Sequence, residues 1–237
     1  MFNLFLWLGT HLGISHTWME HHLHQVTATF VTSVIALLSF IAWQRLRHPE
    51  KCLVPQKKLT LSGLFEFMVA SLLKLMRDVM GERADRYFPL IGSLFIYLLF
   101  SNLLGLIPGF LPPTENVNTN LACALVVFVY YNVVGIKEQG IKNYIKHMAG
   151  PIIWLAPLML AIEIISHLVR PASLSIRLFG NITGDHLVLE IFSNLVPLVV
   201  PIIFMLLGIF VSFIQAFVFT LLSMVYIALA TEHEAHH

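Results

Sequence analysis

The amino-acid sequence predicts an all-α, polytopic membrane protein with about five transmembrane helices. Hydrophobic residues make up 57% of the 237 residues and charged residues only 11%, whereas a soluble domain carries about 25% charged residues. The apolar residues are gathered into runs that, as helices, are long enough to cross the ~30 Å hydrocarbon core of a bilayer. We therefore expect the chain to be surrounded mainly by the lipid bilayer and to have no nucleic-acid partner.

Residues 1–237 are expected to form a single membrane domain. The N-terminal segment, residues 1–25, contains a cluster of histidines and is expected outside the membrane or at its interface. A more polar stretch in the first half of the chain has apolar residues at helical spacing, which indicates an amphipathic helix lying in the interface. The expected helices are, in order, 26–46, 60–82 (the interfacial helix), 87–111, 119–136, 152–195 and 199–230.

The last two apolar segments are longer than a perpendicular crossing requires. About forty helical residues extend about 60 Å, roughly twice the thickness of the hydrocarbon core. The segment 152–195 therefore either breaks at Pro171 or crosses with a strong tilt. Pro197 and Pro201 mark a turn before the last segment. Together the two segments predict a long tilted hairpin.

The distribution of basic residues predicts the orientation. Nine of the 14 lysines and arginines lie between Arg45 and Arg86, and three lie between Lys137 and Lys146. Loops rich in lysine and arginine stay on the cytoplasmic side of a membrane. With five spans, this rule places the N-terminus outside and the C-terminus in the cytoplasm, and we expect a bacterial inner membrane as the location.

Polar residues within the segment 152–195 form a stripe. An arginine near the bilayer centre costs about 2.5–3.5 kcal/mol on insertion scales, so Arg177 is expected to face a polar cavity or a partner. At about 100° per residue, Glu163, Ser166 and Asn181 fall within about 40° of Arg177 on a helix. The pair His186 and Glu190 lies on nearly the opposite side and further toward the outside.

This stripe predicts an ion path that is interrupted in the middle. Histidine titrates near neutral pH, so His186 and Glu190, one turn apart, could share a proton. Arg177 keeps its proton at any ordinary pH and therefore interrupts a continuous proton path while attracting a carboxylate. A single polar residue in a membrane helix more often holds helices together, and His167 is interpreted in that way.

Other functional classes receive less support. Cys52 and Cys123 fit no metal-binding spacing, and the N-terminal His-His-Leu-His motif has no second histidine box. We therefore expect no metal site and no cofactor. A self-contained, proton-coupled secondary transporter is an alternative, although no inverted repeat is visible. A histidine-dependent membrane enzyme is a further alternative, disfavoured by the single histidine cluster.

Two stretches resemble a known family. The stretch Ser175-Ile-Arg-Leu-Phe-Gly-Asn-Ile-Thr-Gly184, followed by Phe213-Ile-Gln-Ala-Phe-Val-Phe219, is similar to subunit a of the F-type ATP synthase. The upstream Glu163…Ser166 pattern and the loop Asn116-Val-Asn-Thr119 fit the same family. The resemblance covers most of residues 26–232.

The resemblance implies a subunit that binds no nucleotide and acts as the ion-conducting stator beside a rotating c-ring. The expected ion is the proton, and peripheral-stalk b subunits are further implied partners. Two offset half-channels would lead to the carboxylates of the c-ring, separated by the essential arginine. The residues implied in proton translocation are Arg177, Asn181, His186, Glu190, Gln215, Glu163 and Ser166.

The resemblance also assigns sides to these residues. It implies that Glu163 and Ser166 line the cytoplasmic half-channel and that His186 lies in the outer one. Gly208 stands where many members carry histidine or glutamate, so Glu190 is expected to replace it. Gln215 and Arg177 are expected at similar depths in the hairpin. We therefore predict a hydrogen bond between their side chains, either direct or through one water.

Overall fold

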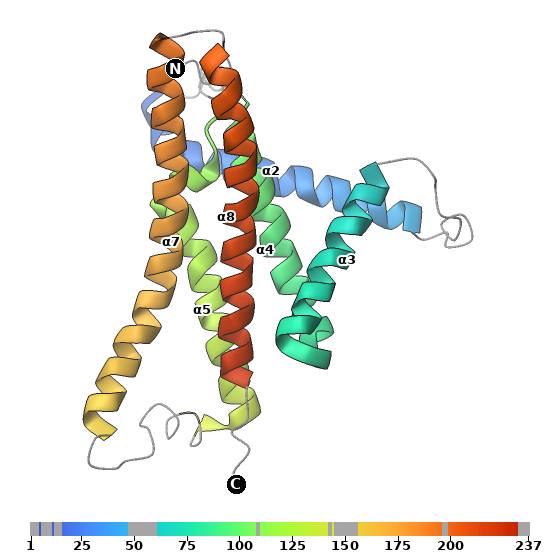
Figure 1. The fold of residues 1–237 in the computed structure, drawn as a ribbon, viewed down its shortest axis with the longest axis vertical. Helices are drawn as coiled ribbons and strands as arrows, with labels where there is room; N and C mark the ends of the chain where they lie inside the picture. Colours follow the sequence, from blue (N-terminus) through green and yellow to red (C-terminus); the bar gives the residue numbers. More distant parts are fainter. Residues whose placement is uncertain are drawn as a thin grey trace. The chain divides into compact units, whose positions relative to one another are not determined.

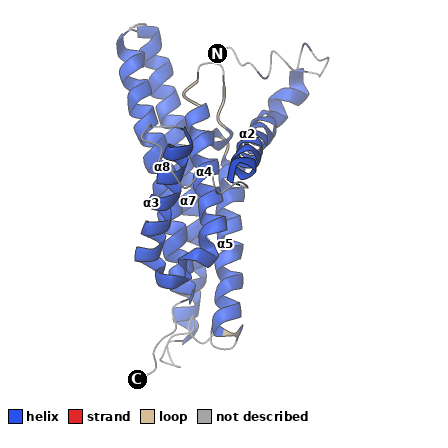
Figure 2. Ribbon diagram, turned by 90° about the vertical axis from the view of Figure 1, so that its right-hand side faces the viewer, coloured by secondary structure: helices blue, strands red, loops and turns tan. Residues whose placement is uncertain are grey.

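The computed structural model of the chain describes residues 5, 11, 16–46, 61–107, 110–141, 144, 156–195 and 199–231. Most of the N-terminal segment, Cys52 and the expected turn at Pro197 lie outside these residues. Within them, the regular elements are all helices (Figure 2). Five helical stretches are long and apolar enough to cross a membrane. The prediction of an all-α, polytopic membrane protein is confirmed.

The contacts of the chain group into two compact units, Met1–Pro113 and Thr114–His237. The first contains α2 (His16–Leu46), α3 (Leu61–Met80), the short helix η2 (Gly81–Arg83) and α4 (Ala84–Leu104). The short helix η3 (Pro113–Glu115) lies at the boundary, and the second unit contains α5 (Val117–Gln139), α7 (Ala156–Leu195) and α8 (Val199–Thr231). The single membrane domain stays a prediction.

Helix α2 begins at His16, ten residues before the expected start of the first span. No glycine or proline interrupts the sequence between His16 and Leu46, so the polar, histidine-rich residues can continue the helix of the apolar segment. The hydroxyl groups of Thr27, Thr29, Thr32 and Ser33 donate to carbonyl oxygens one turn earlier, as Thr27 does to Leu23 at 3.0 Å. This back-bonding satisfies the hydroxyls in apolar surroundings.

Helix α3 packs one face on α4 and leaves the other exposed. Leu72 and Met76 are buried on the packed face, whereas Phe67 is 73% exposed on the other. A turn at η2 joins the helices, and the Arg77 guanidinium forms an ion pair of 3.0 Å with Asp85 across it. The candidate span Phe65–Leu104 includes both α3 and α4. By length and composition, α3 and α4 thus fall into one candidate span. The interfacial position expected for α3 stays a prediction.

Helix α4 ends at Leu104, seven residues before the expected end of its span. The N–H of Gly105 donates to the carbonyl oxygen of Asn102 at 3.2 Å, which tightens the last turn. A proline at position 108 follows, and the residue before a proline disfavours the helical backbone. The expected span was too long at this end because it was based on apolar composition, and the apolar residues continue into the turn.

Helices α5, α7 and α8 pack against one another along their lengths (Figure 1). Helix α7 is a single 40-residue helix that continues through the buried Pro171, so the expected alternative of a break at this proline is wrong. Helices α7 and α8 run antiparallel, as shown by the contact between the rings of Phe192 and Phe204 at 5.0 Å. The two long helices of the expected hairpin are present, and their tilt in a membrane stays a prediction.

Helices α5 and α8 approach closely near the C-terminal end of each. A Cβ atom added at Gly135 would lie 3.2 Å from the carbonyl oxygen of Ala230 and 2.9 Å from the ring of Tyr144. The amide of Gln139 also donates to the carbonyl oxygen of Ala230 at 3.0 Å. After Gln139 the chain turns at Gly140, whose φ of 78° favours glycine.

Candidate functional site

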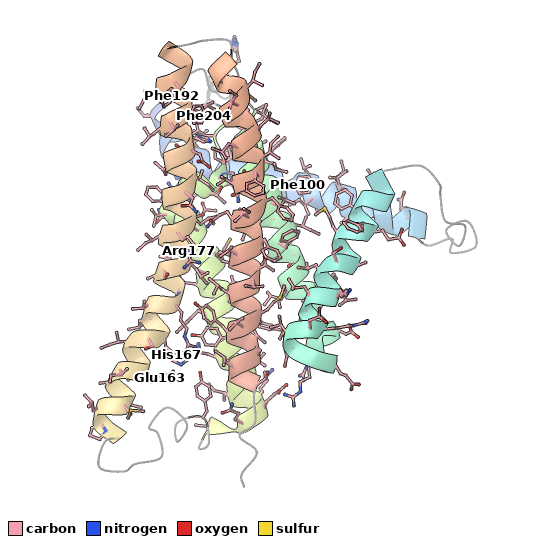
Figure 3. The ribbon with its side chains drawn as sticks, in the orientation of Figure 1. Phe100, Glu163, His167, Arg177, Phe192 and Phe204 are labelled. Carbon is pink, nitrogen blue, oxygen red and sulfur yellow. The ribbon has the colours of Figure 1, made fainter. Side chains whose placement is uncertain are left out.

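Arg177 lies about midway along α7 with its side chain exposed. Figure 3 shows it between Glu163 and His167 toward one end of the helix and Phe192 toward the other. Among the residues that the structure describes, no carboxylate lies within ion-pair distance of its guanidinium. An exposed, unpaired arginine on a helix of this length can therefore bind a carboxylate supplied from outside the chain.

Gln215 bonds to Asn181 and not to Arg177. The Nδ2 atom of Asn181 donates to Oε1 of Gln215 at 2.7 Å, and Gln215 is only 3% exposed. The direct form of the predicted contact between Gln215 and Arg177 is therefore wrong, and the form through one water stays a prediction. The register of the antiparallel helices places Gln215 opposite Asn181, one turn further along α7 than Arg177.

His186 has its acidic partner in the loop before α5. Its Nδ1 atom lies 3.7 Å from Oε2 of Glu115, with both side chains partly buried. Within the described ranges no hydrogen bond or ion pair joins His186 to Glu190, which is exposed. The structure therefore gives His186 the acidic partner Glu115, and a proton shared between His186 and Glu190 stays a prediction. Sequence reasoning missed Glu115, although it is the one acid of an otherwise uncharged loop.

The surroundings of Glu115 favour its protonated form. Burial raises the pKa of this carboxyl above its usual value, and the nearby charge of Glu190 raises it further. His186 acts in the opposite direction, and the net effect is an increase of the pKa. The carboxyl of Glu115 is thus shifted toward the pH range in which it can exchange a proton.

A second polar cluster lies toward the N-terminal end of α7. The ring of His167 is held on both sides, with Nε2 at 3.2 Å from Oε1 of Glu163 and Nδ1 at 2.9 Å from the hydroxyl of Tyr131. The guanidinium of Arg170 lies 3.6 Å from Oε1 of Glu163 and over the rings of Tyr131 and Tyr226, at 5.9 and 5.2 Å. His167, interpreted from sequence as a packing residue, is therefore part of a charged network.

Ser166 lies on α7 next to this cluster but outside its bonds. Its side chain is partly exposed, and no described residue receives a hydrogen bond from its hydroxyl. The residues that the structure adds here are Tyr131 and His167, which come from different helices. Of these two residues, only His167 could have been found from the sequence, because it follows Glu163 by four residues and so lies on the same helical face.

The two clusters lie on opposite sides of Arg177 along α7. Glu163 and His186 are 14 residues before and nine residues after Arg177, or about 21 Å and about 14 Å along a helix. These separations are too large for direct proton transfer to the arginine. The site therefore consists of two titratable groups of residues with a permanent positive charge between them.

The sequence matches the family model of the ATP synthase A chain over residues 26–228. The chain belongs to the ATP synthase subunit a family. It is 51% identical over 236 residues to ATP synthase subunit a 1 of Syntrophotalea carbinolica, covering 98% of each chain. It is 44% identical over 230 residues to ATP synthase subunit a of Bdellovibrio bacteriovorus, covering 97% of this chain and 99% of that one.

Subunit a is a non-catalytic, integral membrane component of the ATP synthase and works with the other subunits of that complex. Within the described ranges of this subunit a, no group of three or more histidine, cysteine or acidic residues could hold a metal ion. The family membership removes the alternatives of a self-contained secondary transporter and of a histidine-dependent membrane enzyme.

Proposed function

We propose that this subunit a conducts protons to and from the carboxylates of a rotating c-ring through two offset half-channels. The observation that carries the proposal is the position of Arg177. Its guanidinium is exposed and unpaired among the described residues, and it lies between two titratable clusters on α7. A permanent charge at this point interrupts a proton path between the clusters and attracts a carboxylate.

The outer half-channel includes His186 and Glu190, and the inner one includes Glu163 and Ser166. A proton that enters from outside neutralises a c-ring carboxylate, which can then move through lipid at a much smaller cost than a charged group. After rotation the carboxylic acid meets the inner half-channel and releases its proton. Arg177 binds the emptied carboxylate and prevents a proton from passing directly between the half-channels.

The hydrogen bond between Asn181 and Gln215 supports this role of Arg177. It joins α7 to α8 one turn from Arg177 and directs the side chain of Gln215 toward Asn181. Among the described residues no hydrogen bond joins Gln215 to Arg177, so the charge of Arg177 is available for the c-ring. The membrane potential supplies about 2.3 kcal/mol per proton at 100 mV, so several protons are needed for each ATP.

The proposal includes the assembly and the orientation. The partners are the c-ring and the peripheral-stalk b subunits, and the location is the bacterial plasma membrane. The positive-inside rule supports an outer N-terminus and a cytoplasmic C-terminus, because most basic residues lie between Arg45 and Arg86, up to the first turn of α4, or from Lys137, in the last turn of α5, to Lys146. In this orientation His186 lies nearer the outside and Glu163 nearer the cytoplasm.

Replacement of Arg177 tests the proposed function. In the complete ATP synthase reconstituted in liposomes, Arg177→Ala is expected to reduce proton-driven ATP synthesis to background while the complex still assembles. Arg177→Lys is expected to fail as well, since a point charge lacks the planar fork of a guanidinium. Lys74→Ala, which removes an exposed charge from α3, is the matched control. Normal synthesis by Arg177→Lys would contradict the proposal.

A further inference from the structure

The loop that carries Glu115 is held in place on both sides of that residue. The side chain of Asn116 accepts a hydrogen bond from the backbone N–H of Asn118 at 2.9 Å and so caps α5. The Nδ2 atom of Asn120 donates to the carbonyl oxygen of Thr114 at 2.7 Å, and both of these residues are fully buried. The position of Glu115 is therefore determined by its neighbours and not by its own ion pair.

The carboxylate of Glu115 lacks the hydrogen bonds that a buried acid normally has. Its Oε2 atom is buried and accepts no hydrogen bond in the part of the chain that the structure describes. The same atom faces Nδ1 of His186 at 3.7 Å, which is an ion-pair distance but longer than a hydrogen bond. A buried carboxylate in such a place is stable only when it carries a proton or faces a cation.

Among the residues that the structure describes, the charged groups identified around this pair come from α7. They are His186 itself, the adjacent Asp185 and the exposed Glu190, whose charge acts on Glu115. The described part of α8, Val199–Thr231, contains no Asp, Glu, His, Lys or Arg, and α5 has none before Lys137. The described part of α8 therefore has no acid that could pair with His186. The acid that does so, Glu115, comes from the loop before α5.

We propose that Glu115 and His186 together form the outer proton-uptake site of this subunit a. The proposal deepens the proposed function and rests on it. A proton from outside binds the neutral imidazole of His186, and the imidazolium is held by the Glu115 carboxylate. The proton then passes to a c-ring carboxylate, and His186 returns to its neutral form. The pair takes up one proton and gives up one, so its net charge changes from −1 to zero and back.

The assignment gives Glu190 a different role. Glu190 is exposed and makes no bond to His186 within the described residues, but its charge favours protonation of the buried pair. Glu115 therefore holds the proton-binding position, and Glu190 adjusts it from one turn beyond His186.

The test uses the complete ATP synthase in liposomes, with ATP synthesis driven at a fixed K⁺ diffusion potential. The pH is varied on the side from which protons enter. Glu115→Gln is expected to move the midpoint of the rate profile by about one pH unit or more toward acid, because an opposite charge at this distance no longer favours protonation. Glu82→Gln, an exposed acid in η2, is the matched control and should leave the midpoint unchanged.

An exchange variant separates a proton-binding role from a structural one. Glu115→His combined with His186→Glu keeps one acid and one base at the site and is expected to recover part of the rate lost by His186→Glu alone. A rate that falls equally at every pH, with no shift of the midpoint in Glu115→Gln, would overturn the proposal. If Glu115→Gln does not assemble, Glu115→Ala, which also removes the negative charge, is measured instead, and an unmoved midpoint there has the same meaning.

Arg177→Ala in the same preparation distinguishes the two proposals. Loss of synthesis in Arg177→Ala together with an unmoved midpoint in Glu115→Gln rejects only the Glu115–His186 site. Synthesis that persists in Arg177→Ala rejects the proposed function, whatever Glu115→Gln shows. Loss of synthesis in the first variant and an acid shift in the second support both.

Discussion

Arg170 and Arg177 show how residues of one type on one helix acquire different roles. The guanidinium of Arg170 lies near Glu163 and over two tyrosine rings, which compensate its charge within the chain. Arg177, two turns further, has no such partner among the described residues. The first charge stabilises a helix contact, and the second is available to another subunit.

The raised pKa of Glu115 predicts a pH-dependent stability of its loop. The charged carboxylate is less favourable in the folded loop than in the unfolded one, so the stabilisation from protonation is complete below the unfolded pKa of about 4.3 and is lost as pH rises through the folded pKa. Glu115→Gln should therefore slow amide hydrogen exchange of residues 113–120 at about pH 7.5, and by less near pH 4.5. Faster exchange in this variant at about pH 7.5 would contradict the prediction.

Gln215 gives a prediction at the same scale. Gln215→Leu removes the acceptor of the Asn181 amide and is expected to cost about 0.5–1.5 kcal/mol of stability. Gln215→Glu places a carboxylate one turn from Arg177, where it competes with the c-ring for the guanidinium. At equal proton motive force, synthesis should be slower in the glutamate variant than in the leucine variant. The reverse order of the two rates would reject this explanation.

At the scale of elements, α5 connects the two ends of the site. The loop before it carries Glu115, and its later turns carry Tyr131, which holds His167 in the other cluster. Near its start, Ser175 of α7 donates to the carbonyl oxygen of Val117 at 3.4 Å. The position of α5 against α7 therefore determines both clusters, although α5 itself contains no acid or base of the proposed translocation path.

The close approach of α5 and α8 predicts a contrast between two glycines. A Cβ at Gly135 would lie 3.2 Å from a backbone oxygen of α8, whereas a Cβ at Gly180 would meet nothing within 4 Å. Alanine is favoured over glycine by about 1 kcal/mol inside a helix. Gly180→Ala should therefore keep or raise the thermal stability of the assembled complex, and Gly135→Ala should lower it. Equal stabilities of the two variants would show that α5 and α8 can separate at no cost.

At the scale of the whole molecule, the surroundings determine most of the architecture. In a bilayer every backbone N–H and C=O must be bonded within the chain, so long apolar segments become helices. Large hydrophobic side chains are exposed along α7 and α8, including Leu168, Ile176 and Phe210, each above 60%. Such surfaces suit lipid or other apolar subunits, and the rare charges among them mark the site.

The sequence by itself determined the helices, the pair of long neighbouring helices and the position of a charge, Arg177, about midway along one of them. Each of these depends on local quantities, namely the length of an apolar segment and the cost of a charge within it. The sequence could not show that His186 pairs with Glu115, 71 residues earlier, or that Gln215 bonds to Asn181. These partners depend on the register and the close packing of α5, α7 and α8. A shift of one helical turn, about 5 Å, exchanges one partner for another while leaving every apolar pattern unchanged.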